Sequence, residues 1–273
     1  MKLHTVALLL ASLALAGCSS KQPITYTAPA ATISNPQVLL LGEVHDNKEG
    51  HKLRYDDLRQ RVEAGWRPVI AMEQFDRDSQ AMLDEAQKGC LDAYCLIKAM
   101  DKKGWDWQLY YPVIDLALSN KLPIVAANLS RADASKVVRD GLTMSFDAAT
   151  VAAYKLKDPL PPDLRRGQEK AIQEGHCNMV SEIMLPGMVN AQVARDIWMA
   201  KLIREQQPRD VVLIAGNGHV RKDIGVPRWL NAIEPRLNVR TIGFIEPDGV
   251  VGSYDEIRKV PVQKRTDPCR NLK

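Results

Sequence analysis

Short, largely apolar runs recur along the chain, and each is followed by small or polar residues. The first is Val38–Leu41, and runs of the same kind occupy residues 68–72, 123–129, 211–215 and 239–245. A strand that is apolar at every position is buried on both faces, as in a parallel sheet that helices cover on each side. The pattern therefore predicts a mostly parallel β-sheet flanked by helices.

The segments between these runs have helical spacing. Residues 47–64 place their apolar residues near one face, and residues 189–200 repeat apolar positions every three to four residues. Strands that alternate with helices predict an α/β fold with right-handed crossovers. Residues 90–107 look irregular, and we expect a helical insertion or lid there. No second domain boundary is evident, so we interpret residues 36–273 as one domain.

Polar side chains follow three of the predicted strands. Glu43 and His45 come after the first strand, Glu73 after the second and His219 after the fourth. The carboxyl ends of parallel strands share one edge of a sheet, where ligand crevices form. If the three strands are neighbours, two carboxylates and two imidazoles meet there, which suits general acid–base catalysis or a divalent metal ion. Each residue alone is as readily a structural hydrogen-bonding group.

Two further candidates lie close to these strand ends. His51 follows His45 by about one and a half helical turns, and it reaches the same edge or lies on the surface. Arg221 follows the turn Gly216–Gly218. Its guanidinium fork suits a carboxylate, and the alternative is a solvated basic residue after a tight turn.

Three polar residues interrupt the apolar helix at 189–200, namely Gln192, Arg195 and Asp196. We interpret Arg195 and Asp196 as a buried ion pair that braces the sheet.

The N-terminus is typical of an export signal, which we assign to residues 1–17. Its apolar run at 6–16 is too short to span a bilayer, and small residues precede Cys18. These small residues resemble a bacterial lipobox, which implies cleavage before Cys18 and its lipidation with acyl chains such as palmitate. Ser19 then favours the outer membrane, and residues 18–35 predict a flexible tether. The alternative is an ordinary signal peptide with an incidental cysteine.

The remaining cysteines are Cys90, Cys95, Cys177 and Cys269. An even number in an exported protein favours disulfides. Cys90 and Cys95 close a short loop, and Cys177 with Cys269 would tie the C-terminal tail to the domain. The alternative leaves Cys177 as a free thiol.

Bulk composition excludes several function classes. The formal net charge of +4 is small and scattered, and aromatic residues make up 5% of the chain, so nothing favours nucleic acid as a partner. The sequence has no P-loop motif, and it has no C-x-x-C-H motif for covalent haem attachment.

Taken in order, the motifs resemble the ChaN-like family of haem-binding uptake lipoproteins, within the Tiki and erythromycin-esterase superfamily. The segments that carry the resemblance lie within residues 36–247 and are Leu41–Asp46 with His51, Ala71–Glu73, Trp107 with Tyr110 and Pro112, His176–Cys177, Gln192–Ala200, and Ala215–Arg221 with Gly225–Pro227.

The resemblance implies a lipoprotein that binds iron haem non-covalently and takes part in haem and iron acquisition without catalytic turnover. Related proteins hold the iron through a tyrosine, for which Tyr110 and Tyr111 are the candidates here and Tyr154 is a weaker one. A homodimer and a haem receptor are the protein partners that it suggests. The residues expected near the haem propionates or as a second ligand are His45, His219 and Arg221, and His51 is a further haem-binding candidate.

Two other hypotheses stay open. Superfamily relatives use carboxylates and imidazoles as esterases or metal-dependent proteases. A periplasm-facing hydrolase, with or without a divalent metal, is therefore the alternative, and its catalytic residues would be Glu43, His45, Glu73 and His219. The third hypothesis is an interaction module that hands cargo to a receptor and has no cofactor of its own.

Overall fold

The structure is a computed structural model, and it describes residues 34–101, 103–249, 252–266 and 269–270. The predicted signal peptide, the lipidation of Cys18 and nearly all of the tether lie outside the described residues. Within the described residues, no helix is both long enough and apolar enough to cross a bilayer.

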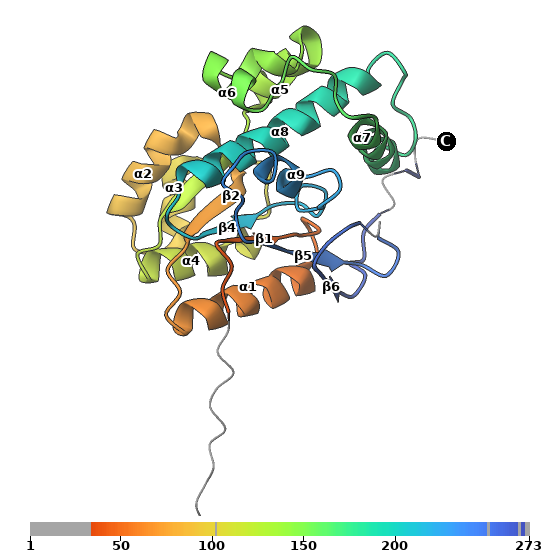
Figure 1. Cartoon of the computed structure of the whole chain (residues 1–273). Helices are drawn as coiled ribbons and strands as arrows, with labels where there is room; N and C mark the ends of the chain where they lie inside the picture. The colour runs from red at the N-terminus through yellow and green to blue at the C-terminus, as the bar shows by residue number, and fades with distance from the viewer. Residues whose placement is uncertain (1–33, 102, 250–251, 267–268, 271–273) are drawn as a thin grey trace, which may run out of the picture. The chain divides into compact units, whose positions relative to one another are not determined.

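The described strands form one parallel sheet, as the sequence predicts (Figure 1). They are β1 (Val38–Leu41), β2 (Val69–Asp76), β3 (Ile124–Asn128), β4 (Val211–Ile214), β5 (Val239–Ile245) and β6 (Glu256–Lys259). Their order across the sheet is β3-β2-β4-β1-β5-β6, and each neighbouring pair is parallel. The sequence does not reveal β6, because this short edge strand is mostly charged and has no apolar run.

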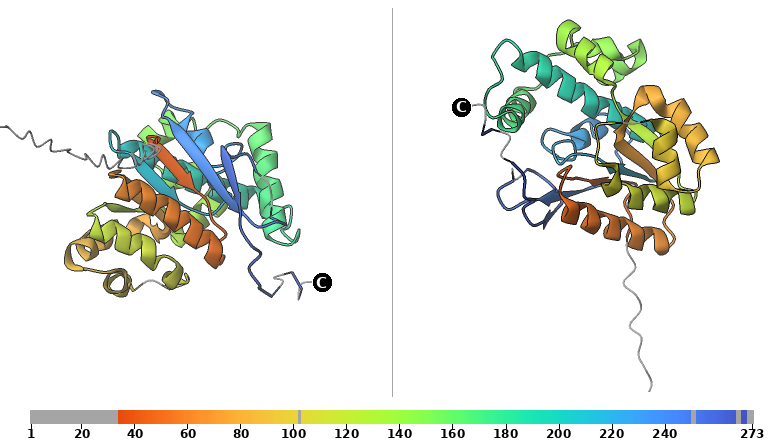
Figure 2. Two further views of the ribbon diagram at one scale, coloured as in Figure 1. Left: turned by 90° about the horizontal axis from the view of Figure 1, so that it is seen from below. Right: turned by 180° about the vertical axis from the view of Figure 1, so that it is seen from behind.

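Helices cover both faces of the sheet (Figure 2). One layer contains α1 (Lys48–Glu63), α2 (Gln80–Gly89), α3 (Ala93–Met100) and α4 (Tyr111–Ser119). The other contains α5 (Arg131–Asp140), α6 (Ala148–Ala153), α7 (Pro162–Gly175), α8 (Leu185–Glu205) and α9 (Val226–Leu230).

Each central strand contributes side chains to two separate hydrophobic cores, because side chains alternate between the faces of a sheet. In β1, Val38 and Leu40 belong to the α5–α9 core, whereas Leu39 and Leu41 belong to the α1–α4 core. All four are fully buried. Burying each such side chain contributes roughly 1.5–3 kcal/mol, which explains why the strand is apolar at every position.

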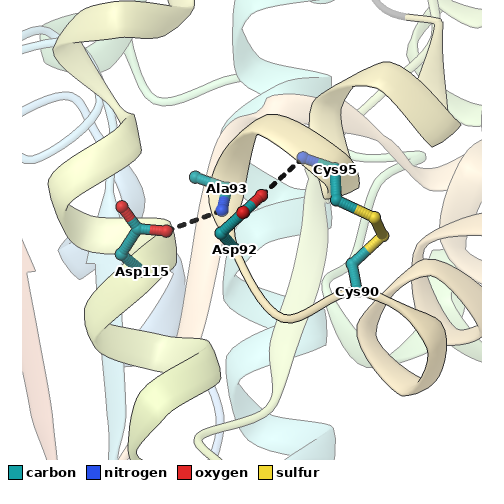
Figure 3. Close-up of a disulfide and its surroundings, with 5 residues drawn as sticks. All are labelled: Cys90, Asp92, Ala93, Cys95 and Asp115. Atoms are coloured by element: carbon teal, nitrogen blue, oxygen red, sulfur yellow. Dashed lines mark hydrogen bonds between the residues drawn. A yellow bond between two sulfur atoms is a disulfide. The ribbon is translucent and has the colours of Figure 1, made fainter.

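The predicted insertion at residues 90–107 contains the regular helix α3. A disulfide between Cys90 and Cys95 joins the end of α2 to α3, with the Cα atoms 5.4 Å apart (Figure 3). Asp92 caps α3 by accepting a hydrogen bond from the Cys95 amide at 2.8 Å, and Asp115 of α4 accepts one from the Ala93 amide at 2.6 Å. The insertion is therefore part of the helical layer, packed against α2 and α4.

The second predicted disulfide is also present. Cys177, in the loop after α7, bonds to Cys269 in the C-terminal tail, with the Cα atoms 5.6 Å apart. The alternative of a free Cys177 thiol is therefore wrong. Because the two cysteines are 92 residues apart in sequence, this bond fixes the tail to the helical layer that contains α7.

Candidate functional site

The strand order brings the predicted residues together. Strand β4 lies between β2 and β1, so the three strands that carry the predicted residues are adjacent at the centre of the sheet. Glu73 lies within β2, which continues to Asp76 beyond the predicted apolar run, whereas Glu43 and His219 follow β1 and β4. Glu43, His45, Glu73 and His219 all line one cleft of about 700 Å³ at the carboxyl ends of these strands. The two carboxylates and two imidazoles therefore meet in one cleft, as the sequence predicts.

Glu43 lies at the bottom of this cleft, with 1% of its side chain exposed. It forms an ion pair with Arg54 of α1, and its Oε1 atom accepts hydrogen bonds from the Tyr110 hydroxyl at 2.6 Å and the Gln74 amide at 3.1 Å. A buried carboxylate is stable when it is paired and hydrogen-bonded in this way. Burial lowers the pKa of Arg54 to about 10, which still leaves it charged at neutral pH.

His45 is the group that connects Glu43 with the cleft. Its Nδ1 atom lies 2.7 Å from Glu43 Oε1, and nearly half of its side chain is exposed. The Trp105 ring contacts the imidazole edge-on, with the ring centroids 4.9 Å apart. A carboxylate on Nδ1 orients an imidazole and leaves Nε2 for a ligand or a proton, as in acid–base dyads.

His219 is held between two carboxylates. Its Nδ1 atom is 2.6 Å from Asp196 Oδ1, and its Nε2 atom is 3.5 Å from Glu73 Oε1. Burial lowers the pKa of His219, but the two carboxylates raise it more, to about 10. Burial raises the pKa of Glu73, but His219, His45 and the Gly216 amide lower it more, to about 2. His219 is therefore an imidazolium at neutral pH, and Glu73 is ionised.

Helix α8 contributes Asp196 to this cluster of charges. The predicted ion pair between Arg195 and Asp196 is wrong. Asp196 does not pair with Arg195 to brace the sheet, because its carboxylate is taken by His219 and by Gln168, whose amide donates at 3.2 Å. Burial raises the pKa of Asp196 to about 6. Arg195 lines the cleft instead. The i, i+3, i+4 spacing of Gln192, Arg195 and Asp196 marks one helix face, and it is the signal that could have revealed this arrangement.

At Gly42 and Gly216 the absence of a side chain allows neighbouring polar side chains to lie close to the backbone. A Cβ atom at Gly216 would lie 3.1 Å from the His45 ring, and one at Gly42 would lie 2.2 Å from Asn217 Oδ1. Asn217 needs that space because its side chain bonds the backbone of Phe244 twice, at 2.7 and 3.1 Å. These bonds fix the turn after β4 against β5.

Several predicted residues lie outside the cleft wall. His51 is buried behind His45, where its Nε2 atom is 3.0 Å from the His45 carbonyl oxygen, and burial lowers its pKa. Tyr110 is fully buried behind Glu43, and burial raises its pKa. Tyr111 begins α4, and neither tyrosine lines the cleft. Tyr154 lies in the α5–α9 core.

Arg221 does line the cleft, as expected, but its guanidinium is already paired with Asp223 at 2.6 and 3.0 Å. Sequence reasoning did not single out Tyr254, which also lines the cleft and donates a hydrogen bond to the Asn217 carbonyl oxygen at 3.2 Å. Tyr254 comes just before the edge strand β6, so no apolar run draws attention to it.

The cluster does not have the geometry of a metal centre. Among the described residues, no group of three or more His, Cys, Asp or Glu side chains is arranged to hold a metal ion. The acids and imidazoles of the cleft bind one another instead, in the pairs described above.

Comparison with known proteins identifies the family. The family described as "Haem-binding uptake, Tiki superfamily, ChaN" matches residues 30–230. This chain belongs to that family. The match covers all three strand ends that form the cleft, and it ends before β5, β6 and Tyr254. A search of curated proteins finds no match.

One solved structure supports the fold, and two others are more distant. The structure that describes cofacial haem binding to ChaN of Campylobacter jejuni has a TM-score of 0.65 and 22% identity, and the match covers 81% of this chain and 86% of that one. The type III effector HopBA1 is 12% identical, with a TM-score of 0.46 and coverage of 83% and 88%. An erythromycin esterase is 14% identical, with a TM-score of 0.42 and coverage of 77% and 70%.

Proposed function

We propose that this protein binds iron haem non-covalently in the cleft at the carboxyl ends of β1, β2 and β4, and that it serves haem and iron acquisition. The observation that carries the proposal is the cleft itself in a chain that belongs to a haem-binding family. A volume of about 700 Å³ is in the range of roughly 300–1,000 Å³ that is usual for small-molecule and cofactor sites.

The residues of the cleft fit a planar, apolar ligand with anionic groups. Val44, Ala171 and Ile245 supply apolar surface, whereas Arg195 and Arg221 supply guanidinium groups. Haem has an apolar ring and two carboxylates, so it matches both kinds of surface. Haem bound here would bring an iron ion, for which imidazole and phenolate are common protein ligands.

We propose Tyr254 as the iron ligand in preference to Tyr110 and Tyr111, because Tyr254 lines the cleft and the other two tyrosines do not. Burial raises the pKa of Tyr254 to about 12, and a bound ferric ion would favour its ionised form by direct charge attraction. Tyr254→Phe should then shift the haem absorption spectrum. Tyr111→Phe is the matched control, since Tyr111 begins α4 and does not line the cleft.

Titration of the purified domain with hemin tests the proposal. We expect a Soret band that differs from that of free hemin and saturates with added ligand. An unchanged hemin spectrum at all protein concentrations would refute haem binding. Metal analysis of the same sample would show whether a divalent ion accompanies the protein.

A hydrolase is the second candidate function, because His45 and Glu43 form an oriented dyad. The Nε2 side of His45 lies over Gly216, beside the Glu73 carboxylate, which places a general base within reach of a cleft-bound ester or amide. This candidate predicts hydrolysis of ester or peptide substrates that is lost in His45→Ala. Absence of the Soret change together with such turnover would favour it over haem binding.

We also propose that the chain is a lipoprotein anchored through Cys18, with the outer membrane as its location. The support is the sequence before Cys18 alone. Labelling with a palmitate analogue in cells tests it, with Cys18→Ser as the control that should lose the label. A haem receptor and a homodimer are the protein partners expected, and crosslinking in cells would detect either.

A further inference from the structure

The charges that line the cleft are almost all neutralised by a partner. Glu43 pairs with Arg54, Glu73 with His219, and Glu246 with Arg265. The fourth acid of the cleft wall is Glu174, which lies 3.8 Å from the ammonium group of Lys170. Every carboxylate in the described wall therefore has a cationic partner within 4 Å.

The cations of the wall are neutralised in the same way, with one exception. His45 is bound to Glu43, His219 lies between two acids, and Arg221 is held in a fork by Asp223. Among the described residues, Arg195 has no hydrogen-bond or ion-pair partner, although its side chain lines the cleft. It is therefore the one uncompensated charge of the described cleft wall.

The fold holds Arg195 in that position. The next residue in α8, Asp196, is completely buried and bonded to His219 at 2.6 Å, which fixes the rotation of the helix. Gln192, one turn earlier, lies across the same imidazole, with its amide nitrogen 3.2 and 3.3 Å from the two ring nitrogens. Residues at i, i+3 and i+4 share a helix face, so Arg195 is directed to the cleft by the contacts of its neighbours.

We propose that Arg195 is the anion-binding residue of the cleft, which makes the ligand class an apolar molecule that carries a carboxylate. This inference rests on the proposed function where the ligand is haem, because the carboxylate is then a propionate. An arginine binds a carboxylate through two parallel, charge-assisted hydrogen bonds. Arg221 cannot provide the same fork without giving up Asp223.

The test is a comparison of two ligands that differ in one group. Hemin and its dimethyl ester have the same ring and iron, but the ester has no carboxylate. For wild type we expect hemin to bind more tightly than the ester. Arg195→Gln should weaken hemin binding by about tenfold to a hundredfold, as expected for loss of a charged hydrogen-bonded pair, and leave binding of the ester unchanged. Arg195→Lys should recover part of the loss.

Arg236→Gln is the matched control, because Arg236 is an exposed arginine that pairs with Glu234 and does not line the cleft. It should bind hemin as wild type does. Circular dichroism and thermal unfolding of each variant would show that the fold is kept. Equal hemin affinity of wild type and Arg195→Gln would overturn the inference while leaving haem binding itself intact.

A ligand without iron separates the two proposals. Pyrenebutyrate is a planar apolar carboxylate, and its methyl ester lacks the charge; fluorescence anisotropy reports binding of either. If hemin leaves wild type spectrally unchanged, haem binding fails, and the inference is still decided by pyrenebutyrate. Weaker binding of the acid by Arg195→Gln would support it. Binding that is absent, or equal in the two proteins, would contradict it.

Discussion

At the scale of single residues, the site consists of buried charges that stabilise one another. Glu43 has 1% of its side chain exposed, and four different side chains contact it. Such a group is costly to bury, and removing one partner of a buried pair leaves the other uncompensated. The positions of His45 and His219 are therefore set by carboxylates rather than by packing alone. Their protonation and orientation follow from the same contacts.

Gly216→Ala tests how closely the backbone approaches His45. The added Cβ atom would lie 3.1 Å from the Cε1 and Nε2 atoms of the ring, so the imidazole has to move by a few tenths of an ångström. We expect hemin affinity to fall several-fold, measured by titration. Gly218→Ala is the control in the same turn, since its Cβ atom would meet nothing within 4 Å. Equal affinities of the two variants would contradict this reading of the turn.

The protonation of His219 predicts how stability depends on alkaline pH. Its pKa in the folded protein is about 10, above the ordinary value of 6.5, so its contribution is complete below pH 6.5 and is lost as pH rises toward 10. We expect the free energy of unfolding, measured in urea, to fall over this range. Ring-nitrogen NMR should find His219 doubly protonated at pH 8, and a neutral ring at that pH would refute the assignment.

At the scale of elements, the N-terminal cap of helix α1 links segments of the chain that lie far apart in sequence. Helix α1 begins after Asn47, whose side-chain oxygen accepts a hydrogen bond from the Gly50 amide at 2.8 Å. The same side chain donates to Glu246 at 2.6 Å and to the Pro261 carbonyl oxygen at 2.7 Å. One helix cap thus connects the loop after β1 with the segments that follow β5 and β6.

Asn47→Ala should therefore cost more than the loss of an ordinary cap. A cap is worth about 1 kcal/mol, and each of the two other hydrogen bonds of Asn47 adds about 1 kcal/mol. Asp147→Ala is the control, because Asp147 caps α6 through the Thr150 amide at 2.7 Å at an exposed site. Urea unfolding should show a loss of about 3 kcal/mol for the first variant and about 1 kcal/mol for the second. Equal losses would contradict the joining role of Asn47.

At the scale of the whole molecule, the C-terminal tail that follows β6 is joined both to the loops at the strand ends and to the α5–α9 layer. Arg265 binds Asp46 and Glu246 beside the cleft, each at 2.8 Å, and Cys269 is bonded to Cys177 just beyond α7. Asp46 and Glu246 follow β1 and β5, whereas Cys177 follows α7. The C-terminal segment thus contacts the strand-end loops and the helical wall of the cleft.

The two disulfides should differ in what they contribute. Closing a loop of 92 residues restricts the unfolded chain by about 4–5 kcal/mol in the chain-entropy model, against about 2 kcal/mol for a loop of 5 residues. Replacing Cys177 and Cys269 by serine should lower the unfolding free energy more than replacing Cys90 and Cys95. Hemin affinity should also fall in the first variant alone. A larger loss of stability in the second variant would contradict this prediction.

The sequence by itself determined the layers and the chemistry. Apolar runs located the strands β1 to β5, because burial on both faces leaves no polar position in a central parallel strand. Glu43 and His219 could be placed just after strands for the same reason, whereas Glu73 lies inside β2, which continues to Asp76. The short edge strand β6 escaped detection, because an edge strand has no such constraint.

Tertiary structure decided which of these groups are partners. The insertion of β4 between β1 and β2 makes the three strand ends adjacent, and strand order is a long-range property that periodicity does not encode. The rotation of α8 about its axis brings Asp196 against His219 and Arg195 to the cleft. The sequence pattern had favoured an ion pair between Arg195 and Asp196. Local pattern fixes which side chains are buried, whereas only the packed elements fix what each buried charge meets.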